Sequence, residues 1–514
     1  MEKRKEIFVL IVCVLIGFAL RFYAFDKKSL WIDEIHTFNE SRDDLRGQLA
    51  YYQENPTHLH PPLFFILTHL FYPFTRPERD IRIIPLVFGT LCIPMIYLLS
   101  RLFSRSIALP CALSLTFMAY HIYFSQDGRM YSLIMFLGMA GLYFFMKHLE
   151  TLKRVYLLFV ALFFSIMVYT SYSTIPFIAL SQTLFFYRAR EDNPKTPFSS
   201  LFILNGTLLL LCIPWFLFII SNYKGQSIMD PFTIQDIGPF SSIIQGMLND
   251  WAPHLPLTVV SATLLILFPF FSKNKKNALI LLSLLILPLL GLYLYCRLLN
   301  VTQFITSRYF IDFLPLFLIT LFLSLHAIEG RVGKLKRLIR PMPLFLILFI
   351  ASNLFFLPLY YHSEKQDFRG LVNYLNGQLR NGDRIFVRSY TYLPGILHYF
   401  GINPMKRHYE IPFEWKVPGK EFEFRVSLNS ENRAFTIYHS NICCAQYVAD
   451  GNRLWIVVGK EAAEEIKKST SVALKGYFDG SFSNFRRFPS DASMYLFLWD
   501  PLSSEGKGIL IPDQ

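Results

Sequence analysis

The stretch Ser29-Leu-Trp-Ile-Asp-Glu-Ile-His36 follows the first long apolar run of the chain and carries two adjacent carboxylates, Asp33 and Glu34. A carboxylate beside a bilayer is costly unless it is solvated or paired, so acids in such a position are candidates for function. Neighbouring side chains point about 100° apart on a helix, so one carboxylate can face a substrate while the other faces a cation or a metal. A solvated loop after a helix would explain the same residues, and the rest of the chain has to decide between the two interpretations.

The composition is that of a polytopic membrane protein. Of the 514 residues, 53% are hydrophobic, and the mean hydropathy is +0.36, which is unlike a soluble enzyme. The net charge of +13 does not indicate a nucleic-acid partner, because the Lys and Arg residues fall in short loops between apolar runs. The seven Cys residues are scattered, so they predict neither a metal site nor a disulfide framework.

Apolar segments recur along the first 360 residues at the length of about 20 residues that a helix needs to cross a bilayer. They predict about 11 transmembrane helices, at residues 7–25, 82–100, 106–124, 130–147, 155–172, 173–188, 199–220, 256–272, 277–296, 309–328 and 341–360. The segment 60–74 is also apolar, but it is short and it begins at Pro61-Pro62. The expected fold class is therefore a polytopic α-helical membrane protein.

The distribution of Lys and Arg predicts the orientation of these helices. If segment 60–74 does not cross the membrane, every strongly basic loop lies on one side, as the excess of cations in cytoplasmic loops requires. We therefore expect 60–74 to be an interfacial or re-entrant helix on the outer face. The chain is then a multi-pass protein of the cytoplasmic (inner) membrane, with its N-terminus in the cytoplasm and everything after Tyr361 outside.

The last 150 residues are hydrophilic and predict a separate domain. Residues 366–380 have helical spacing of apolar positions, and β-like runs follow at 384–387, 434–438, 454–458 and 494–499. We expect residues 1–360 to form a transmembrane domain with a catalytic outer loop at 26–81. Residues 361–514 are expected to form a soluble extracytoplasmic α/β domain.

Two histidines precede the short apolar segment, in His58-Leu-His-Pro-Pro-Leu63. A His-x-His pair is a weak metal signal, because further ligands have to come from elsewhere in the chain. A polar contact from His60 to a substrate is the favoured interpretation. A divalent metal held by Glu34, His58 and His60 stays an alternative, and no cofactor is required.

Three arginines are expected at the same outer face of the membrane: Arg21, Arg129 and Arg308. A guanidinium group can bind a phosphate with two parallel hydrogen bonds, which suits these residues to a phosphate-bearing ligand. Each of them could instead be an interfacial arginine that reaches toward the headgroups, beside a tyrosine of the aromatic belt. Three cations beside two acids at one face favour the functional interpretation.

These stretches also match a known family. They are Leu20-Arg-Phe-Tyr23, Ser29-Leu-Trp-Ile-Asp-Glu34, His60-Pro-Pro-Leu63, Ser125-Gln-Asp-Gly-Arg-Met-Tyr-Ser-Leu133 and Ser307-Arg-Tyr-Phe310. The chain resembles, over roughly residues 1–330, the bacterial membrane glycosyltransferases of the GT-C fold, family 39 type. These enzymes are related to protein O-mannosyltransferases and to the aminoarabinose transferase of lipid A. Gln366-Asp-Phe-Arg-Gly370 is similar to the start of the extracytoplasmic domain that many of them carry.

The resemblance implies transfer of a sugar from a polyprenyl-phosphate carrier to a hydroxyl outside the cytoplasmic membrane. Asp33 would accept the proton of the acceptor as general base, and Glu34 would orient the acceptor or hold a metal. Groups that bind the donor phosphate would be Arg129, Arg308, Tyr131 and Arg21. Further contacts to substrate would come from His60, Asp127 and Tyr309. The acceptor can be a lipid, a glycan or a protein, and membrane lipids surround the chain.

Two other functions remain as alternatives. A transporter or flippase of a lipid-linked sugar would typically show inverted repeats and polar groups at the bilayer midplane, whereas the polar residues here cluster at one predicted face. A catalytically inactive protein of the same fold would not need the acidic pair. The intact Asp33-Glu34 argues against it, but weakly.

Overall fold

The computed structural model describes residues 2–54, 60–187, 197–223, 238–298, 305–331, 340–402, 423–430, 433–440, 452–468, 472–482, 485 and 492–502. The chain forms two compact units. The first contains Met1–Phe25 and Ser41–Leu359, and the second contains Asp26–Glu40 and Tyr360–Gln514. Residues 26–40, which were expected in the outer loop of the membrane domain, thus group with the C-terminal residues. The domain boundaries predicted from the sequence stay a prediction.

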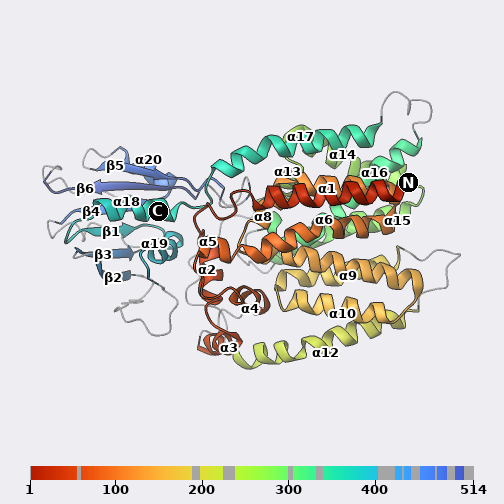
Figure 1. Ribbon diagram of the computed structural model, residues 1–514, viewed down its shortest axis with the longest axis horizontal. Coiled ribbons are helices and arrows are strands. Elements are labelled where there is room, and N and C mark those ends of the chain that lie inside the picture. The colour runs from red at the N-terminus through yellow and green to blue at the C-terminus, as the bar shows by residue number, and fades with distance from the viewer. Residues whose placement is uncertain are drawn as a thin grey trace. The chain divides into compact units, whose positions relative to one another are not determined.

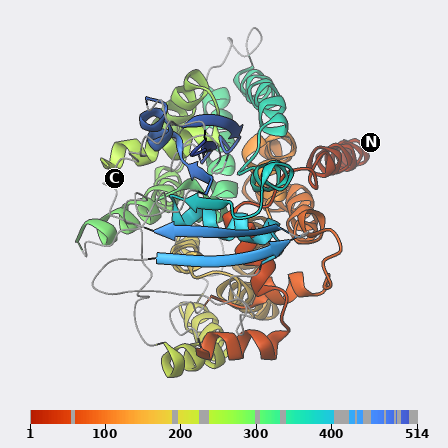
Figure 2. The same ribbon diagram turned by 90° about the vertical axis from the view of Figure 1, so that its left-hand side faces the viewer.

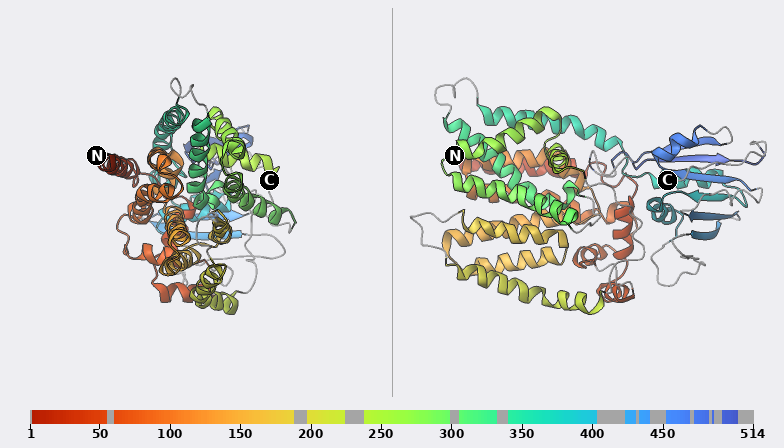
Figure 3. Two further views of the ribbon diagram at one scale, coloured as in Figure 1. Left: turned by 90° about the vertical axis from the view of Figure 1, so that its right-hand side faces the viewer. Right: turned by 180° about the vertical axis from the view of Figure 1, so that it is seen from behind.

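The first unit is a helical bundle whose long members run side by side (Figure 1) and are seen end-on in Figure 3, left. Its longer helices are α1 (Glu2–Phe22), α6 (Ile83–Phe103), α7 (Arg105–Phe117), α9 (Tyr131–Thr151), α10 (Val155–Val168), α12 (Ser199–Asn222), α13 (Phe240–Trp251), α14 (Leu255–Phe271), α15 (Lys275–Leu298), α16 (Leu314–Arg331) and α17 (Pro341–His362). Their continuous apolar sequences suit a bilayer, where backbone N–H and C=O groups must bond within the protein. The predicted polytopic helical class is confirmed.

Six helical segments among the described residues are long and apolar enough to cross a membrane, or up to eight if each of two bent helix pairs is one span. The bent pairs are Arg105–Phe117 with Ala119–Ser125, at 61°, and Phe240–Trp251 with Leu255–Phe271, at 110°. The expected span 155–172 contains a 14-residue helix, α10. The expected span 173–188 contains only short helices, among them α11 (Ile175–Ser181). The count of about 11 stays a prediction.

The break between α7 and α8 (Ala119–Ser125) positions the turn at residues 125–131. Met118 has an extended backbone conformation between the two helices, and the first amide of a helix has no acceptor within that helix. Asn353 of α17 supplies the acceptor, because its Oδ1 lies 2.9 Å from the backbone N of Ala119. A side chain more than 200 residues away thus fixes the direction in which α8 leaves the break.

The segment 60–74 contains one short helix, α4 (Leu63–His69), which begins directly after Pro61-Pro62. The backbone N–H of Leu63 donates to the carbonyl of Tyr169, at 3.0 Å, which ties the start of α4 to the end of α10. Two further short helices, α3 (Leu45–Glu54) and α5 (Pro77–Asp80), lie on either side of it in the sequence. A helix of seven residues is far shorter than a span, and its interfacial position stays a prediction.

The second unit contains a six-stranded sheet with the order β2-β3-β1-β4-β6-β5, which Figure 1 shows side by side. Its strands are β1 (Arg384–Val387), β2 (Glu423–Ser430), β3 (Arg433–Ser440), β4 (Leu454–Val458), β5 (Ala473–Phe478) and β6 (Met494–Trp499). Strand β1 pairs parallel with β3 and β4, and the outer pairs are antiparallel, as Figure 2 shows for β2 and β3. Its helices are α2 (Ile32–Glu40), α18 (Phe368–Gln378), α19 (Leu393–Tyr399) and α20 (Lys460–Ile466). The predicted C-terminal sheet domain is confirmed.

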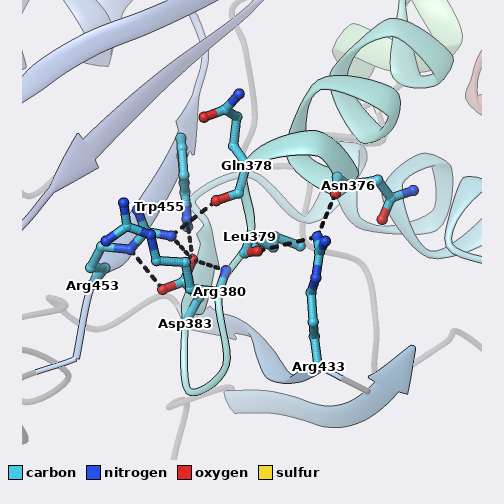
Figure 4. Close-up of polar contacts among 8 residues, drawn as sticks. All are labelled: Asn376, Gln378, Leu379, Arg380, Asp383, Arg433, Arg453 and Trp455. Carbon is cyan, nitrogen blue, oxygen red and sulfur yellow. Dashed lines mark hydrogen bonds and ion pairs between the residues drawn. The ribbon is translucent and has the colours of Figure 1, made fainter. Parts of the chain in front are cut away.

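A buried ion pair fixes the entry of the chain into β1 (Figure 4). The Asp383 carboxylate accepts from Arg453 Nε at 2.9 Å and from Arg453 Nη2 at 2.5 Å. It also accepts from Trp455 Nε1 at 2.9 Å and from the Arg380 backbone N at 2.9 Å. Only 3% of the Asp383 side chain is exposed, and 12% of that of Arg453. This carboxylate therefore joins β1 to β4 from inside the protein.

Asp383→Ala is expected to destabilise the second unit strongly. Removing one partner of a buried ion pair leaves the other charge uncompensated, which costs about 3–5 kcal/mol. The midpoint of thermal unfolding of the detergent-solubilised protein should fall by on the order of 10 °C. The matched control is Glu465→Gln, at an exposed carboxylate of α20, which should leave the midpoint unchanged. An equal midpoint for the two variants would contradict this role for Asp383.

Candidate active site

A cavity of about 760 Å³ in the first unit combines polar and apolar walls. Its polar lining residues are His60, Arg129, Thr170, Ser171, Tyr172, Ser173, Tyr295 and Tyr309. Its apolar lining comes mainly from Phe64, Phe65, Leu180, Leu287, Pro288, Leu292, Phe310 and Phe313. Three of the residues predicted as substrate contacts, from three distant parts of the sequence, thus meet in one cavity: His60, Arg129 and Tyr309.

The turn that carries Arg129 is held by short side-chain contacts. Gln126 Nε2 donates to the carbonyls of Arg21 and Tyr23, both at 2.7 Å. The Ser125 hydroxyl donates to the carbonyl of His121 at 2.6 Å. Gly89 of α6 lets this turn approach closely, because a Cβ at residue 89 would come within 2.1 Å of the Ser125 hydroxyl oxygen. The sequence from 125 to 131 therefore forms a fixed turn that presents the half-buried Arg129 to the cavity.

Two other residues of this motif do not line the cavity. Asp127 is fully buried, and its backbone carbonyl accepts from the N–H of Arg129 at 2.6 Å. Tyr131 begins α9 and is also buried, with its ring edge-on to Phe124 at a centroid distance of 4.9 Å. Both residues support the turn, and their predicted contacts to donor and substrate stay predictions.

Arg21, at the end of α1, is fully buried. Its guanidinium group donates to the carbonyls of Leu115 at 2.8 Å, Thr116 at 3.2 Å and Gly17 at 2.9 Å, and it lies 2.7 Å from Nδ1 of His121. The carbonyls of Leu115 and Thr116 belong to the last turn of α7. The last carbonyls of a helix receive no hydrogen bond from an N–H group of the same helix. Arg21 thus stabilises the break between α7 and α8, and it is not a lining residue of the cavity.

The motif Ser307-Arg-Tyr-Phe310 opens the 3-10 helix η3 (Ser307–Phe313). The Arg308 guanidinium lies over the ring of Tyr309, at 5.3 Å from the centroid. The Ser307 hydroxyl donates to the Asp250 carboxylate at 2.6 Å, which anchors η3 to the end of α13. Tyr309 lines the cavity, whereas Arg308 does not. The predicted contact of Arg308 with the donor phosphate stays a prediction.

Two buried acids were missed from the sequence. Asp250 is 8% exposed and holds Ser307, and Asp312 is 1% exposed, with no side-chain hydrogen-bond partner among the described residues. An acid within a membrane span is a candidate for function. The sequence could have identified Asp312, because this residue is a lone acid inside the expected span 309–328. Asp250 lay between the expected spans 199–220 and 256–272, where nothing in the sequence set it apart.

The acidic pair lies in the second unit, in the first turn of α2. Glu34 is fully buried, and its Oε2 accepts from the backbone N of Trp31 at 3.4 Å. This contact from the third helical residue back to the residue before the helix is half of a capping box. Asp33 is half-buried. The structure therefore gives Glu34 a function in starting α2, and Asp33 is the more accessible carboxylate.

The described residues contain no group of three His, Cys, Asp or Glu side chains suited to hold a metal ion. His60 is exposed and stacks on Phe65 at 6.2 Å between ring centroids. Glu34 belongs to the other unit, and His58 lies outside the described residues. A metal site formed by these three residues stays a prediction.

Comparisons with known proteins give a family match over part of the chain and a shared fold over nearly all of it. The profile described as dolichyl-phosphate-mannose-protein mannosyltransferase matches residues 59–218. This range contains His60 and Arg129, whereas Asp33 and Arg308 lie outside it. No curated protein matches the chain.

Two solved structures share the architecture over nearly the whole chain. ArnT from Cupriavidus metallidurans in the apo state has a TM-score of 0.50 and 9% identity, over 95% of this chain and 97% of that chain. ArnT from the same organism bound to undecaprenyl phosphate has a TM-score of 0.52 and 10% identity, over the same shares of the two chains. The family match and the shared architecture confirm the resemblance found in the sequence: this chain has the GT-C fold of membrane glycosyltransferases.

Proposed function

We propose that the protein transfers a sugar from a polyprenyl-phosphate carrier to an acceptor hydroxyl at the outer face of the cytoplasmic membrane. The observation that carries this proposal is the cavity of the first unit, whose lining joins Arg129 and Tyr309 to an extended apolar wall. A sugar linked to a lipid phosphate likewise combines polar and apolar parts, because its anionic phosphate lies between a polar sugar and an apolar chain. One of the ArnT structures similar to this chain contains undecaprenyl phosphate.

The lining residues suit the parts of such a donor. A guanidinium group offers a fork of N–H donors that matches two phosphate oxygens, so Arg129 binds the donor phosphate. The apolar side chains of α11 and α15, among them Leu180, Leu287 and Leu292, contact the isoprenoid chain. His60 and Tyr309 offer hydrogen bonds to the sugar hydroxyls.

The transfer is a substitution at the anomeric carbon of the sugar. The acceptor oxygen forms a bond to this carbon while the bond from the carbon to the phosphate oxygen breaks, and polyprenyl phosphate leaves. Negative charge grows on the leaving phosphate, where Arg129 stabilises it without reorganisation. The Asp33 carboxylate takes the proton of the acceptor hydroxyl. Glu34 fixes the first turn of the helix that carries Asp33. The reaction written in this way requires no metal.

The orientation in the membrane belongs to the same proposal. With the odd number of 11 spans that the sequence predicts, a protein with its N-terminus in the cytoplasm places the second unit outside, where acceptor hydroxyls of lipids, glycans or proteins are available. The Lys and Arg residues of the predicted cytoplasmic loops support this orientation.

The test is a transfer assay with the purified protein in liposomes. A polyprenyl-phosphate sugar with a labelled sugar is supplied, together with candidate acceptors, and the lipid products are separated by mass. Sugar-free polyprenyl phosphate should accumulate in step with labelled acceptor. A labelled donor that crosses the liposome membrane with its glycosidic bond intact would instead identify a transporter.

A further inference from the structure

Residues 27–32 are held by side chains and carbonyls more than 300 positions later in the sequence. Within the second unit, the backbone N–H groups of Ser29, Leu30 and Ile32 each donate to a C-terminal side chain. These acceptors are Glu364 Oε2 at 3.1 Å, Tyr399 Oη at 2.8 Å and Gln366 Oε1 at 2.9 Å, in that order. Three amides of the segment leading into α2 are therefore bonded to the C-terminal part of its own unit, whereas the amide of Trp31 is bonded to Glu34.

Two neighbouring cations strengthen the same attachment. Lys28 Nζ donates to the carbonyl of Tyr360 at 2.8 Å and to that of Ser363. Arg369 bonds the same segment from the other side, because its backbone N donates to the Ser29 hydroxyl at 3.2 Å and its guanidinium donates to the carbonyl of Lys27. These contacts fix the direction of the chain before the helix starts.

The contact at Ile32 bears most directly on Asp33. Ile32 is the first residue of α2, so its N–H has no acceptor within the helix. Gln366 supplies that acceptor and is itself only 4% exposed. Leu30 is completely buried, so the hydroxyl of Tyr399 cannot readily be replaced by bulk water. Gln366 and Tyr399 thus set the place and the direction of the first turn, which carries Asp33 one residue further on.

We propose that Gln366 and Tyr399 are positioning residues for glycosyl transfer: they hold the first turn of α2 so that the Asp33 carboxylate meets the acceptor proton. The C-terminal domain would then contribute directly to the chemical step through the helix that it holds. The proposal rests on the function proposed above, in which Asp33 is the base. A displacement of about 1 Å in a catalytic group can lower a rate by about a hundredfold, so loss of either contact should be visible in turnover.

The test compares matched variants in the transfer assay. Gln366→Met keeps the length of the side chain but removes the acceptor, whereas Gln366→Glu keeps an acceptor oxygen. Tyr399→Phe removes only the hydroxyl. We expect Gln366→Met and Tyr399→Phe to lower kcat by about 10- to 100-fold, with the KM for the donor unchanged. Gln366→Glu should retain most of the activity.

Matched controls lie on α18 of the same unit. Tyr374→Phe removes only a hydroxyl and keeps the ring that packs on Trp455 and Phe478, and Gln378→Met alters an exposed side chain. Neither side chain contacts residues 26–40 in any described interaction, so both variants should turn over at the normal rate. Thermal unfolding of all variants shows whether a lost activity reflects a lost fold.

The deciding measurement is a double-mutant cycle with Asp33→Asn. If Gln366 acts through Asp33, Gln366→Met should lower the rate only while Asp33 is present and should leave the residual rate of Asp33→Asn unchanged. Equal reductions in both backgrounds would overturn the positioning role, because they would indicate a general structural effect. Normal turnover of both Gln366→Met and Tyr399→Phe would overturn it as well, while the proposed function would stand. A wild-type protein that transfers no sugar would refute the function itself.

Discussion

Asp33→Asn should lower turnover by about 10²–10⁴-fold while the donor still binds. Asparagine keeps the size of the side chain and an acceptor oxygen, but it cannot take a proton, and general base catalysis is typically worth that factor in rate. The position of Asp33 in the first turn of α2, with Glu34 and Gln366 fixing that turn, favours a defined place for the carboxylate. The measurement is kcat for sugar transfer by the protein in liposomes, together with the dissociation constant of the donor.

Two variants serve as controls for Asp33→Asn. Asp26→Asn changes a half-buried carboxylate of the same unit, seven positions earlier, and should leave turnover unchanged. Glu34→Gln keeps an oxygen that can accept from the backbone N of Trp31, so it should do less harm than Asp33→Asn. Normal turnover of Asp33→Asn would mean that another group accepts the proton, and Asp250 of the first unit would be the next candidate.

Arg129→Lys should weaken use of the donor by about 10- to 100-fold. A lysine keeps the positive charge but loses the fork that bonds two phosphate oxygens, and a charge-assisted hydrogen bond of this kind is worth about 1.5–3 kcal/mol. Of the three arginines predicted at the outer face, Arg129 is the one that lines the described cavity. The measurements are donor binding, the KM for the donor and kcat, because the contact exists in the bound ground state and strengthens as charge grows on the leaving phosphate.

Two further Arg→Lys variants serve as controls for Arg129→Lys. Arg154→Lys alters an exposed arginine between α9 and α10 and should have no effect on donor binding. Arg308→Lys should have a smaller effect than Arg129→Lys, since the guanidinium of Arg308 lies over the ring of Tyr309 and outside the cavity lining. Equal donor binding by Arg129→Lys and wild type would assign Arg129 to the membrane interface instead.

The parts of the fold that follow from local pattern could be predicted. Long apolar runs predict helices because the bilayer leaves the backbone no other partner. The strands β1, β4 and β6 are short runs of mainly aliphatic and aromatic residues. Strands β2 and β5 were both missed, and the residues of β5 are mostly exposed and show no clear alternation. The break at Met118 was missed too, because the acceptor that it needs comes from Asn353 in a distant helix.

In the candidate site, too, features of one continuous stretch could be predicted, whereas contacts between distant segments could not. The fixed turn around Arg129 and the start of α2 were both apparent as motifs, because each is a continuous stretch of sequence. The bond from Ser307 to Asp250 and the contacts of residues 29–32 with Glu364, Gln366 and Tyr399 were not, since they join distant segments through single side chains. Arg21 was assigned to the donor phosphate from its charge, its place at the end of the first span and the family resemblance. The structure adds that its guanidinium is bonded to backbone carbonyls of α7, and its contact with the phosphate stays a prediction.

The most direct test of glycosyl transfer compares envelope lipids and glycans, by mass spectrometry, from cells that produce either the wild-type protein or Asp33→Asn at equal levels. The proposed function predicts one acceptor that carries an added sugar only with the wild-type protein, and a rise in the sugar-loaded polyprenyl phosphate with the variant. Identical acceptors and carrier pools in the two strains would contradict it.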